Sequence, residues 1–260
     1  MASDEKRFLS IENLSQSFSG LKAVANFSMQ MEEGELVGLI GPNGAGKTTI
    51  FNLLTGIYAP TEGSITFRGQ KLNGLPAYKV AQRGLARTFQ NIRLFADLSV
   101  VDNVKIAYHQ HVTHTALSSM LRLPGHFKNE KIMRDKALEL LKVFQLEDKA
   151  FEQAKNLPYG QQRRLEIARA MATEPKLLLL DEPAAGMNPQ ETRELMDLIR
   201  WLRETYKLTI LLIEHDMALV MGVCERVYVL EYGMLLTVGT PDEVRSDQRV
   251  IDAYLGEEAP

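Results

Sequence analysis

The chain has 260 residues, of which 45% are hydrophobic and 24% charged, close to the averages of soluble globular proteins. This is typical of one large domain, or of one domain with a sizeable insert, and not of a disordered, collagen-like or disulfide-stapled protein. The formal net charge of −3 creates no global positive field, so we expect no nucleic-acid partner. A single cysteine excludes an internal disulfide and favours a reducing compartment.

The sequence offers no segment that would enter a membrane. Its apolar runs, such as residues 177–180 and 210–213, are far shorter than the roughly 18 residues that a spanning helix needs. Residues 1–8 are largely polar and lack the apolar core of a signal peptide. We therefore predict a cytosolic chain that acts at a membrane only by docking onto the helices of other subunits.

The first half of the chain changes from strands to helices. Glycine- and proline-containing turns separate the predicted strands, and further along the apolar residues adopt helical spacing. Pro124 and Gly125 predict a break in the loop that separates two of these helices. The predicted strands are residues 8–14, 27–31, 35–40 and 64–68, and the predicted helices are residues 48–55, 100–109 and 131–146, with the loop at residues 110–129.

From Pro158 onward helices and strands alternate. The predicted strands 176–181 and 208–213 have uninterrupted apolar cores at residues 177–180 and 210–213, as expected only for strands buried on both faces. Buried parallel strands followed by helices predict a layered α/β core. The remaining predicted elements are helices at residues 160–172 and 189–206, a hairpin formed by residues 227–231 and 235–238, and two short helices that close the chain.

Residues 41–48 match the phosphate-binding pattern G-x-x-x-x-G-K-[S/T] without a mismatch, between an apolar strand and a predicted helix. The glycines let backbone amides turn inward around phosphate oxygens, and the helix N-terminus adds positive potential. Lys47 is expected to reach the β- and γ-phosphates and Thr48 to offer its hydroxyl to Mg²⁺. The candidate nucleotide-binding residues here are Gly41, Pro42, Asn43, Gly44, Ala45, Gly46, Lys47, Thr48 and Thr49.

Two adjacent acids follow the apolar run 177–180. A strand parallel to the one before the phosphate loop would deliver Asp181 to the metal, directly or through water. Glu182 would then lie near the γ-phosphate, where a carboxylate can orient or deprotonate an attacking water. The sequence lacks the guanine-reading Asn-Lys-x-Asp motif of GTPases, which favours an ATPase.

Residues 157–161 open an amphipathic helix. Gly160 at the helix N-terminus would expose backbone N–H groups to an anion. We expect this anion to be the γ-phosphate on a second subunit, because the phosphate loop of this chain already holds its own. On these residues alone, an ordinary helix start at a proline remains the alternative.

The phosphate loop, this segment, the two acids and a histidine occur in an order that resembles the nucleotide-binding subunits of ABC transporters over essentially the whole chain. The resemblance implies an α/β P-loop NTPase core, the ABC ATPase fold, with an antiparallel β subdomain and an inserted α-helical subdomain. It implies a single nucleotide-binding domain over residues 1–260, with a catalytic core in about residues 1–90 and 160–245, a helical subdomain in about residues 91–159 and a C-terminal helix or tail in residues 246–260.

The same resemblance assigns further roles. Phe18 takes the position of the aromatic residue that stacks on adenine, with an ordinary core position as its alternative; Gln90 takes that of the Q-loop glutamine. Residues 184–188 correspond to the D-loop, which packs across the dimer, and His215 to the switch histidine at the γ-phosphate. The implied catalytic residues are Lys47, Gln90, Glu182 and His215, and the implied metal ligands are Thr48, Gln90 and Asp181.

The family signature Leu-Ser-Gly-Gly-Gln is altered here, since Pro158 replaces the serine and Tyr159 the first glycine. The lost hydroxyl leaves the backbone amides of Tyr159, Gly160 and Gln161 to contact the nucleotide. From this alteration we expect a weakened signature and one slower composite site. A separate His109, His111 and His114 cluster allows a zinc site in principle, but without a nearby cysteine it favours a solvated surface segment.

Within the family the chain resembles the LivG-type ATP-binding subunits of branched-chain amino acid importers, on residues 87–95, 157–171, 181–188, 212–217 and 253–256. This implies an ATP- and Mg²⁺-dependent ATPase that powers an importer from the cytoplasmic face of the inner membrane. The implied partners are a second ABC ATPase subunit in a heterodimer (a homodimer in vitro), two transmembrane permeases and, indirectly, an extracytoplasmic binding protein. The alternatives are an importer for another substrate and a soluble ABC ATPase such as an iron–sulfur assembly subunit.

Overall fold

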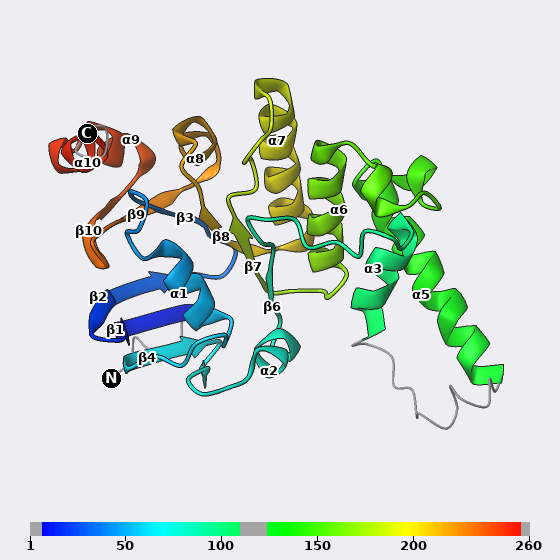
Figure 1. Cartoon of the computed structure of the whole chain (residues 1–260), viewed down its shortest axis with the longest axis horizontal. Coiled ribbons are helices and arrows are strands. Elements are labelled where there is room, and N and C mark those ends of the chain that lie inside the picture. The colour runs from blue at the N-terminus through cyan, green and yellow to red at the C-terminus, as the bar shows by residue number, and fades with distance from the viewer. Residues whose placement is uncertain (1–6, 110–123, 256–260) are drawn as a thin grey trace. The chain divides into compact units, whose positions relative to one another are not determined.

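The computed structural model describes residues 7–109 and 124–255, and the chain divides into two compact units (Figure 1). The first unit comprises Met1–Arg87 and Lys176–Pro260, and the second comprises Thr88–Pro175. The predicted helical segment 91–159 lies within the second unit. Residues 160–175, which the sequence assigned to the catalytic core, also cluster with the second unit.

A mixed sheet of six strands, in the order β10-β9-β3-β8-β7-β6, organises the first unit. Neighbouring strands are parallel except for the antiparallel hairpin β9–β10. Every residue of β3, β7 and β8 is buried, as their uninterrupted apolar runs predict. The strands are β3 (Leu36–Ile40), β6 (Leu85–Arg87), β7 (Leu177–Asp181), β8 (Thr209–Ile213), β9 (Arg226–Glu231) and β10 (Met234–Gly239).

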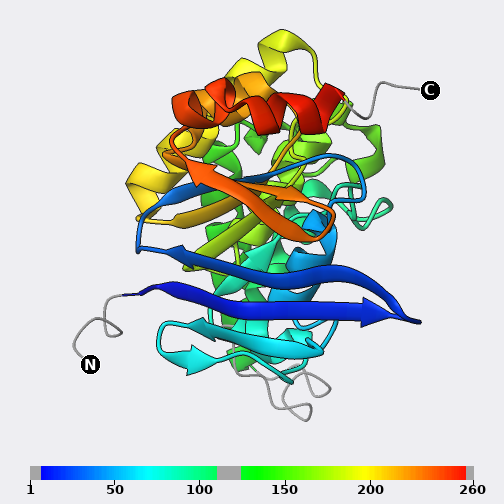
Figure 2. The same ribbon diagram turned by 90° about the vertical axis from the view of Figure 1, so that its left-hand side faces the viewer.

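A second, antiparallel sheet has the order β2-β1-β4-β5 and is drawn in blue and cyan in Figure 2. Its first two strands are longer than the alternation predicts. Asn13 and Asn26 adopt left-handed backbone φ angles of 49° and 51°, and the register shifts near them interrupt the alternation. The strands are β1 (Leu9–Phe18), β2 (Leu21–Met31), β4 (Glu62–Phe67) and β5 (Gln70–Lys71).

One hydrophobic core joins the two sheets to helix α1 (Lys47–Leu54). Ile50, Phe51 and Leu54 of α1 are fully buried in it. Their burial fixes the position of α1, which follows β3 after the loop formed by residues 41–46. The other helices of this unit are α2 (Ala77–Gln82), α7 (Pro189–Tyr206), α8 (Met217–Val223), α9 (Pro241–Ser246) and α10 (Gln248–Leu255).

The second unit is helical. Helix α6 (Tyr159–Met171) packs against α3 (Val100–Tyr108) and α5 (Pro124–Val143), which explains why residues 160–175 cluster here rather than with the sheets. The break predicted at Pro124 and Gly125 is wrong, because α5 begins at Pro124. Proline is favoured at a first helical position, where its missing N–H leaves no intrahelical bond unmade.

Among the described residues, no helix combines the length and the apolar character that crossing a membrane requires. The short turns η3 (Glu147–Lys149) and η4 (Ala154–Asn156) complete the second unit.

Candidate nucleotide-binding and hydrolysis site

The phosphate loop follows β3 and depends on glycines. Gly41 and Gly46 have φ angles of 145° and 102°. A Cβ atom at Gly41 would lie 2.1 Å from the carbonyl oxygen of Leu230, and one at Gly46 would lie 2.7 Å from that of Ala23. Both positions therefore exclude any side chain, and the loop is packed tightly onto the neighbouring strands.

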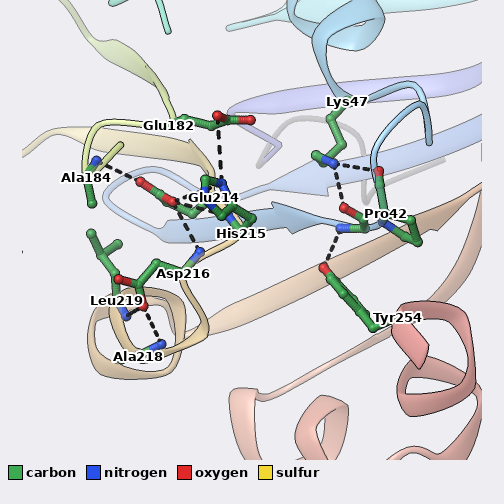
Figure 3. A network of polar contacts seen from close by, with 11 residues as sticks. Pro42, Lys47, Glu182, Ala184, Glu214, His215, Asp216, Ala218, Leu219 and Tyr254 are labelled. Atoms are coloured by element: carbon green, nitrogen blue, oxygen red, sulfur yellow. Dashed lines mark hydrogen bonds and ion pairs between the residues drawn. The ribbon is translucent and has the colours of Figure 1, made fainter. Parts of the chain in front are cut away.

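Lys47, the first residue of α1, is 7% exposed. Its Nζ donates to the carbonyl oxygens of Gly41, at 2.5 Å, and of Pro42, at 2.8 Å (Figure 3). No side chain caps the N-terminus of α1. The loop thus holds a cation beside a helix N-terminus, and both attract phosphate.

Helix α10 also reaches the phosphate loop. The backbone N–H of Gly41 donates to the hydroxyl of Tyr254, with a nitrogen–oxygen distance of 2.9 Å (Figure 3). This contact joins the first residue of the loop to the end of the chain. Sequence reasoning gave Tyr254 no role at the site, because 213 positions separate the two residues.

Asp181 ends β7 at the same edge of the sheet, since β3, β8 and β7 are parallel neighbours. Arg87 Nη2 donates to Asp181 Oδ2 at 2.7 Å, and Arg87 Nη1 donates to Asn52 Oδ1 at 2.7 Å. The side chains of Arg87 and Asp181 are 6% and 4% exposed. A buried guanidinium that donates to two different side chains is a rigid support, so Arg87 fixes the orientation of the Asp181 carboxylate.

These oxygen donors fit Mg²⁺. Thr48 is exposed at the start of α1 and offers a hydroxyl, and Asp181 offers a carboxylate. Mg²⁺ at phosphate sites is usually held by one or two such groups together with phosphate oxygens. Within the described ranges no group of three or more His, Cys, Asp or Glu residues could hold a metal. A magnesium site at a nucleotide phosphate does not need such a group, because phosphate oxygens complete the ligand set.

Glu182 adopts a left-handed φ of 46°, which is unusual for a residue with a side chain. Its backbone N–H donates to the carbonyl oxygen of Ile213 at 2.9 Å, so the turn is fixed to the end of β8. Glu182 Oε2 lies 3.7 Å from Nδ1 of His215. The carboxylate side chain is 16% exposed and the imidazole 61%, which presents the histidine to solvent and to any ligand above the edge.

Glu214, the last residue before His215, was not predicted as a site residue. Its side chain is fully buried. Oε1 accepts from the backbone N–H of Ala184 at 2.8 Å, and Oε2 accepts from those of His215 at 3.1 Å and Asp216 at 3.3 Å (Figure 3). Burial raises the pKa of Glu214 above its usual value, while these three donors oppose the shift.

Phe18 stands at the end of β1, with 38% of its surface exposed. Its ring packs edge-to-face on that of Tyr58, with the ring centroids 5.1 Å apart. This exposure differs from the ordinary core position that was the alternative. An exposed aromatic face can stack on a base, and the adenine-stacking role remains a prediction.

In the second unit a buried ion pair supports the backbone around Gln90. Arg163 is fully buried, and its guanidinium donates to the carbonyl oxygens of Phe89 at 2.6 Å and Gln90 at 2.7 Å, and to Glu166 Oε2 at 2.7 Å. Glu166 Oε1 accepts from the backbone N–H groups of Phe89 and Arg93, both at 3.3 Å. Burial raises the pKa of Glu166, and Arg163 opposes that shift. Helix α6 therefore fixes the backbone on both sides of Gln90.

The altered signature forms the first turn of α6, with Pro158 at the N-cap position and no side-chain cap. Tyr159 is 44% exposed, and its hydroxyl accepts from Arg163 Nη2 at 3.3 Å. Gln161 Oε1 is buried without a hydrogen-bond partner among the described residues. The first turn of α6 thus presents backbone amides that no side chain caps.

Of the three histidines that allowed a zinc site, only His109 is described, at the C-cap of α3. His111 and His114 lie outside the described residues.

Comparison with known proteins decides the family. Residues 24–185 match the family model for the ABC transporter, and residues 235–260 match that of the branched-chain amino acid ATP-binding cassette transporter. The chain belongs to the ABC transporter family. It is an ABC transporter ATPase of the branched-chain amino acid branch, as its motifs predicted.

Two relatives show how far this similarity extends. The high-affinity branched-chain amino acid transport ATP-binding protein LivG of Salmonella typhimurium is 51% identical over 249 residues, which cover 96% of this chain and 98% of that protein. The corresponding protein BraF of Pseudomonas aeruginosa is 46% identical over the same coverage. The similarity therefore extends over nearly the whole chain.

The fold prediction is confirmed by a solved cassette. The crystal structure of the ADP conformation of MJ1267, an ATP-binding cassette of an ABC transporter, superposes with a TM-score of 0.84 at 28% identity. The match covers 96% of this chain and 99% of that one. This cassette thus has the ABC ATPase fold that its motif order implied.

Proposed function

We propose that this cassette binds and hydrolyses ATP with Mg²⁺ to power the import of branched-chain amino acids. The observation that carries the proposal is the edge of the mixed sheet, where Lys47, Asp181, Glu182 and His215 follow three adjacent parallel strands. Identity of 51% to LivG over nearly the whole chain supports the class of substrate. In this proposal, other subunits of the importer bind the amino acid itself.

In the proposed mechanism, the amides of the phosphate loop and the Lys47 ammonium bind the phosphates, and Phe18 stacks on the adenine. Thr48, Asp181 and Gln90 would hold Mg²⁺, with Arg87 orienting Asp181. When bound there, the metal would supply positive charge to offset that of the phosphate oxygens. Glu182 orients the attacking water and accepts its proton, and His215, 3.7 Å from Glu182, steadies that carboxylate and contacts the γ-phosphate.

The signature acts in trans. Tyr159, Gly160 and Gln161 would complete the nucleotide site of a second ABC ATPase, which in turn completes the site of this chain. The uncapped first turn of α6 supports this arrangement, because its free backbone amides can donate to phosphate oxygens. The partner is a different ATPase in the cell, with a homodimer possible in vitro.

The assembly lies at the cytoplasmic face of the inner membrane, where the cassettes dock onto two transmembrane permeases. An extracytoplasmic binding protein delivers the substrate to the permeases. The lack of a membrane-spanning helix among the described residues is consistent with attachment through the permeases.

The test is uptake of radiolabelled leucine, isoleucine and valine by cells that lack this gene. The wild-type chain should restore uptake and Lys47→Ala should not, with equal amounts of both proteins in the membrane fraction. Unchanged uptake in the deletion strain, together with loss of uptake of another solute, would assign the cassette to an importer for that solute. Recovery of the chain without permeases would instead favour a soluble ABC ATPase.

A further inference from the structure

Glu214 is a buried acid to which neither the motifs nor the proposed mechanism gives a role. Its oxygens accept from three backbone N–H donors, and Nδ1 of the neighbouring His215 lies 3.9 Å from Glu214 Oε2. Burying a charged carboxylate away from water destabilises the folded protein unless both of its oxygens accept hydrogen bonds. Three charge-assisted bonds provide that compensation.

The three donors come from two different loops. Ala184 lies two residues after Glu182, in the loop that follows β7, whereas His215 and Asp216 begin the loop that follows β8. One carboxylate therefore bridges the loop of Glu182 and the loop of His215 (Figure 3). The bond from the Glu182 N–H to the Ile213 carbonyl oxygen also joins the same two strand ends.

We infer that Glu214 is a positioning residue, which sets the separation of Glu182 and His215 and links residues 184–188 to the histidine. Residues 184–188 correspond to the D-loop, so a movement there would be transmitted through the Ala184 N–H and the Glu214 carboxylate to His215. This inference rests on the proposed roles of Glu182 and His215 in hydrolysis.

A carboxylate is required for this role, because both of its oxygens face donors. A glutamine at this position has one oxygen and one NH₂ group. It could accept from Ala184 or from the pair His215 and Asp216, but not from both, and its NH₂ group would face an N–H donor. Glu214→Gln therefore keeps the size of the side chain and releases one loop. Glu214→Asp keeps both oxygens but is one methylene shorter, so it too reaches only one loop.

Hydrogen–deuterium exchange of the full-length chain, followed by mass spectrometry of peptides, tests the bridge directly. In Glu214→Gln, one of the two segments, residues 183–188 or residues 214–217, should lose protection, with exchange about 10–100-fold faster for the released amides. Glu214→Asp should expose one of the two segments. Wild-type protection of both segments in both variants would overturn the inference.

Asp216→Ala is the matched control. Asp216 caps α8 by accepting from the N–H groups of Ala218, at 2.8 Å, and Leu219, at 3.3 Å, and its side chain has no bond to Ala184. Its removal should accelerate exchange at the start of α8 and leave residues 183–188 protected. Faster exchange of residues 183–188 in this control would show that general loosening, rather than the Glu214 bridge, connects the loops.

Steady-state kinetics of the full-length chain tests the role in hydrolysis. Glu214→Gln should lower kcat by up to about 100-fold through misplacement of the catalytic groups, with little change in KM for ATP. In a His215→Ala background the same change should cause no further loss, because Glu214 would act through His215. Equal losses in both backgrounds, or a wild-type kcat, would overturn the inference. If His215→Ala alone keeps full activity, the proposed role of His215 fails, while the exchange data still decide whether Glu214 joins the loops.

Discussion

Replacing Glu182 by glutamine isolates the charge at the position proposed to activate water. The amide has nearly the size and shape of the carboxylate, and the backbone bond from residue 182 to Ile213 does not involve the side chain. The side chain is 16% exposed and 3.7 Å from His215 Nδ1, so its loss of charge leaves no fully buried unpaired group. We therefore expect Glu182→Gln to fold normally.

The expected loss of activity is large. A general base contributes about 10²–10⁴-fold to a reaction, which corresponds to about 3–5 kcal/mol of transition-state stabilisation. ATP should bind at least as tightly as in the wild-type chain, since one negative charge beside the triphosphate is removed. Because hydrolysis is the route by which the closed dimer opens, ATP-bound dimers of the variant should persist.

Single-turnover hydrolysis of radiolabelled ATP gives the rate, and size-exclusion chromatography with ATP and Mg²⁺ detects the dimer. EDTA should dissolve the dimer if the metal is needed for closure. Glu174→Gln is the control, because Glu174 also has a left-handed φ, of 51°, but is carried by the second unit and has no proposed role. A rate for Glu182→Gln within threefold of this control, where about 10²-fold is the least expected, would remove Glu182 from the mechanism.

Three further changes test other parts of the structure. Lys47→Ala should weaken ATP binding by at least about 100-fold, because charge-assisted bonds to two phosphates are lost; calorimetry showing wild-type affinity would refute the phosphate-loop assignment. Phe18→Ala should weaken ATP binding by about 1–3 kcal/mol without changing the ATP-to-GTP ratio, whereas a lower Tm with unchanged affinity would indicate a packing role. Burial raises the pKa of Cys224 to about 12, so the thiol should resist iodoacetamide at pH 8 until urea unfolds the chain; rapid labelling of the folded protein would contradict its burial.

The sequence predicted those parts of the fold whose signals are local and strong. The apolar runs of β7 and β8 are long enough to require burial on both faces, and α7 has a capping box formed by Asn188 and Glu191. The short elements β6, α2 and α8 were not predicted, since they have three to seven residues and depend on neighbours distant in sequence. The start of β2 was missed because the bulge at Asn26 breaks the alternation.

The site shows the same division. Lys47 and Asp181 belong to patterns with fixed spacing, and the sequence alone was enough to single them out. Arg87 and Glu214, which support the site through hydrogen bonds, belong to no such pattern. Their hydrogen-bond partners lie far away in the sequence or are backbone atoms. Arg87 is 94 positions from Asp181, and Glu214 is 30 positions from Ala184. Supporting residues of this kind become visible only when the strand ends are placed side by side.

The contacts of Tyr159 with Arg163 give the altered signature a physical explanation. Considered alone, Tyr159 replaces a glycine and fills space at the start of α6, which suggested only a weakened contact to the nucleotide. In the structure its hydroxyl accepts from Arg163, whose guanidinium lies 5.9 Å from the Tyr159 ring centroid. Arg163 also holds the carbonyl oxygen of Gln90. A glycine could make neither contact with Arg163, so the tyrosine extends the support of the Gln90 backbone to the first turn of the signature helix.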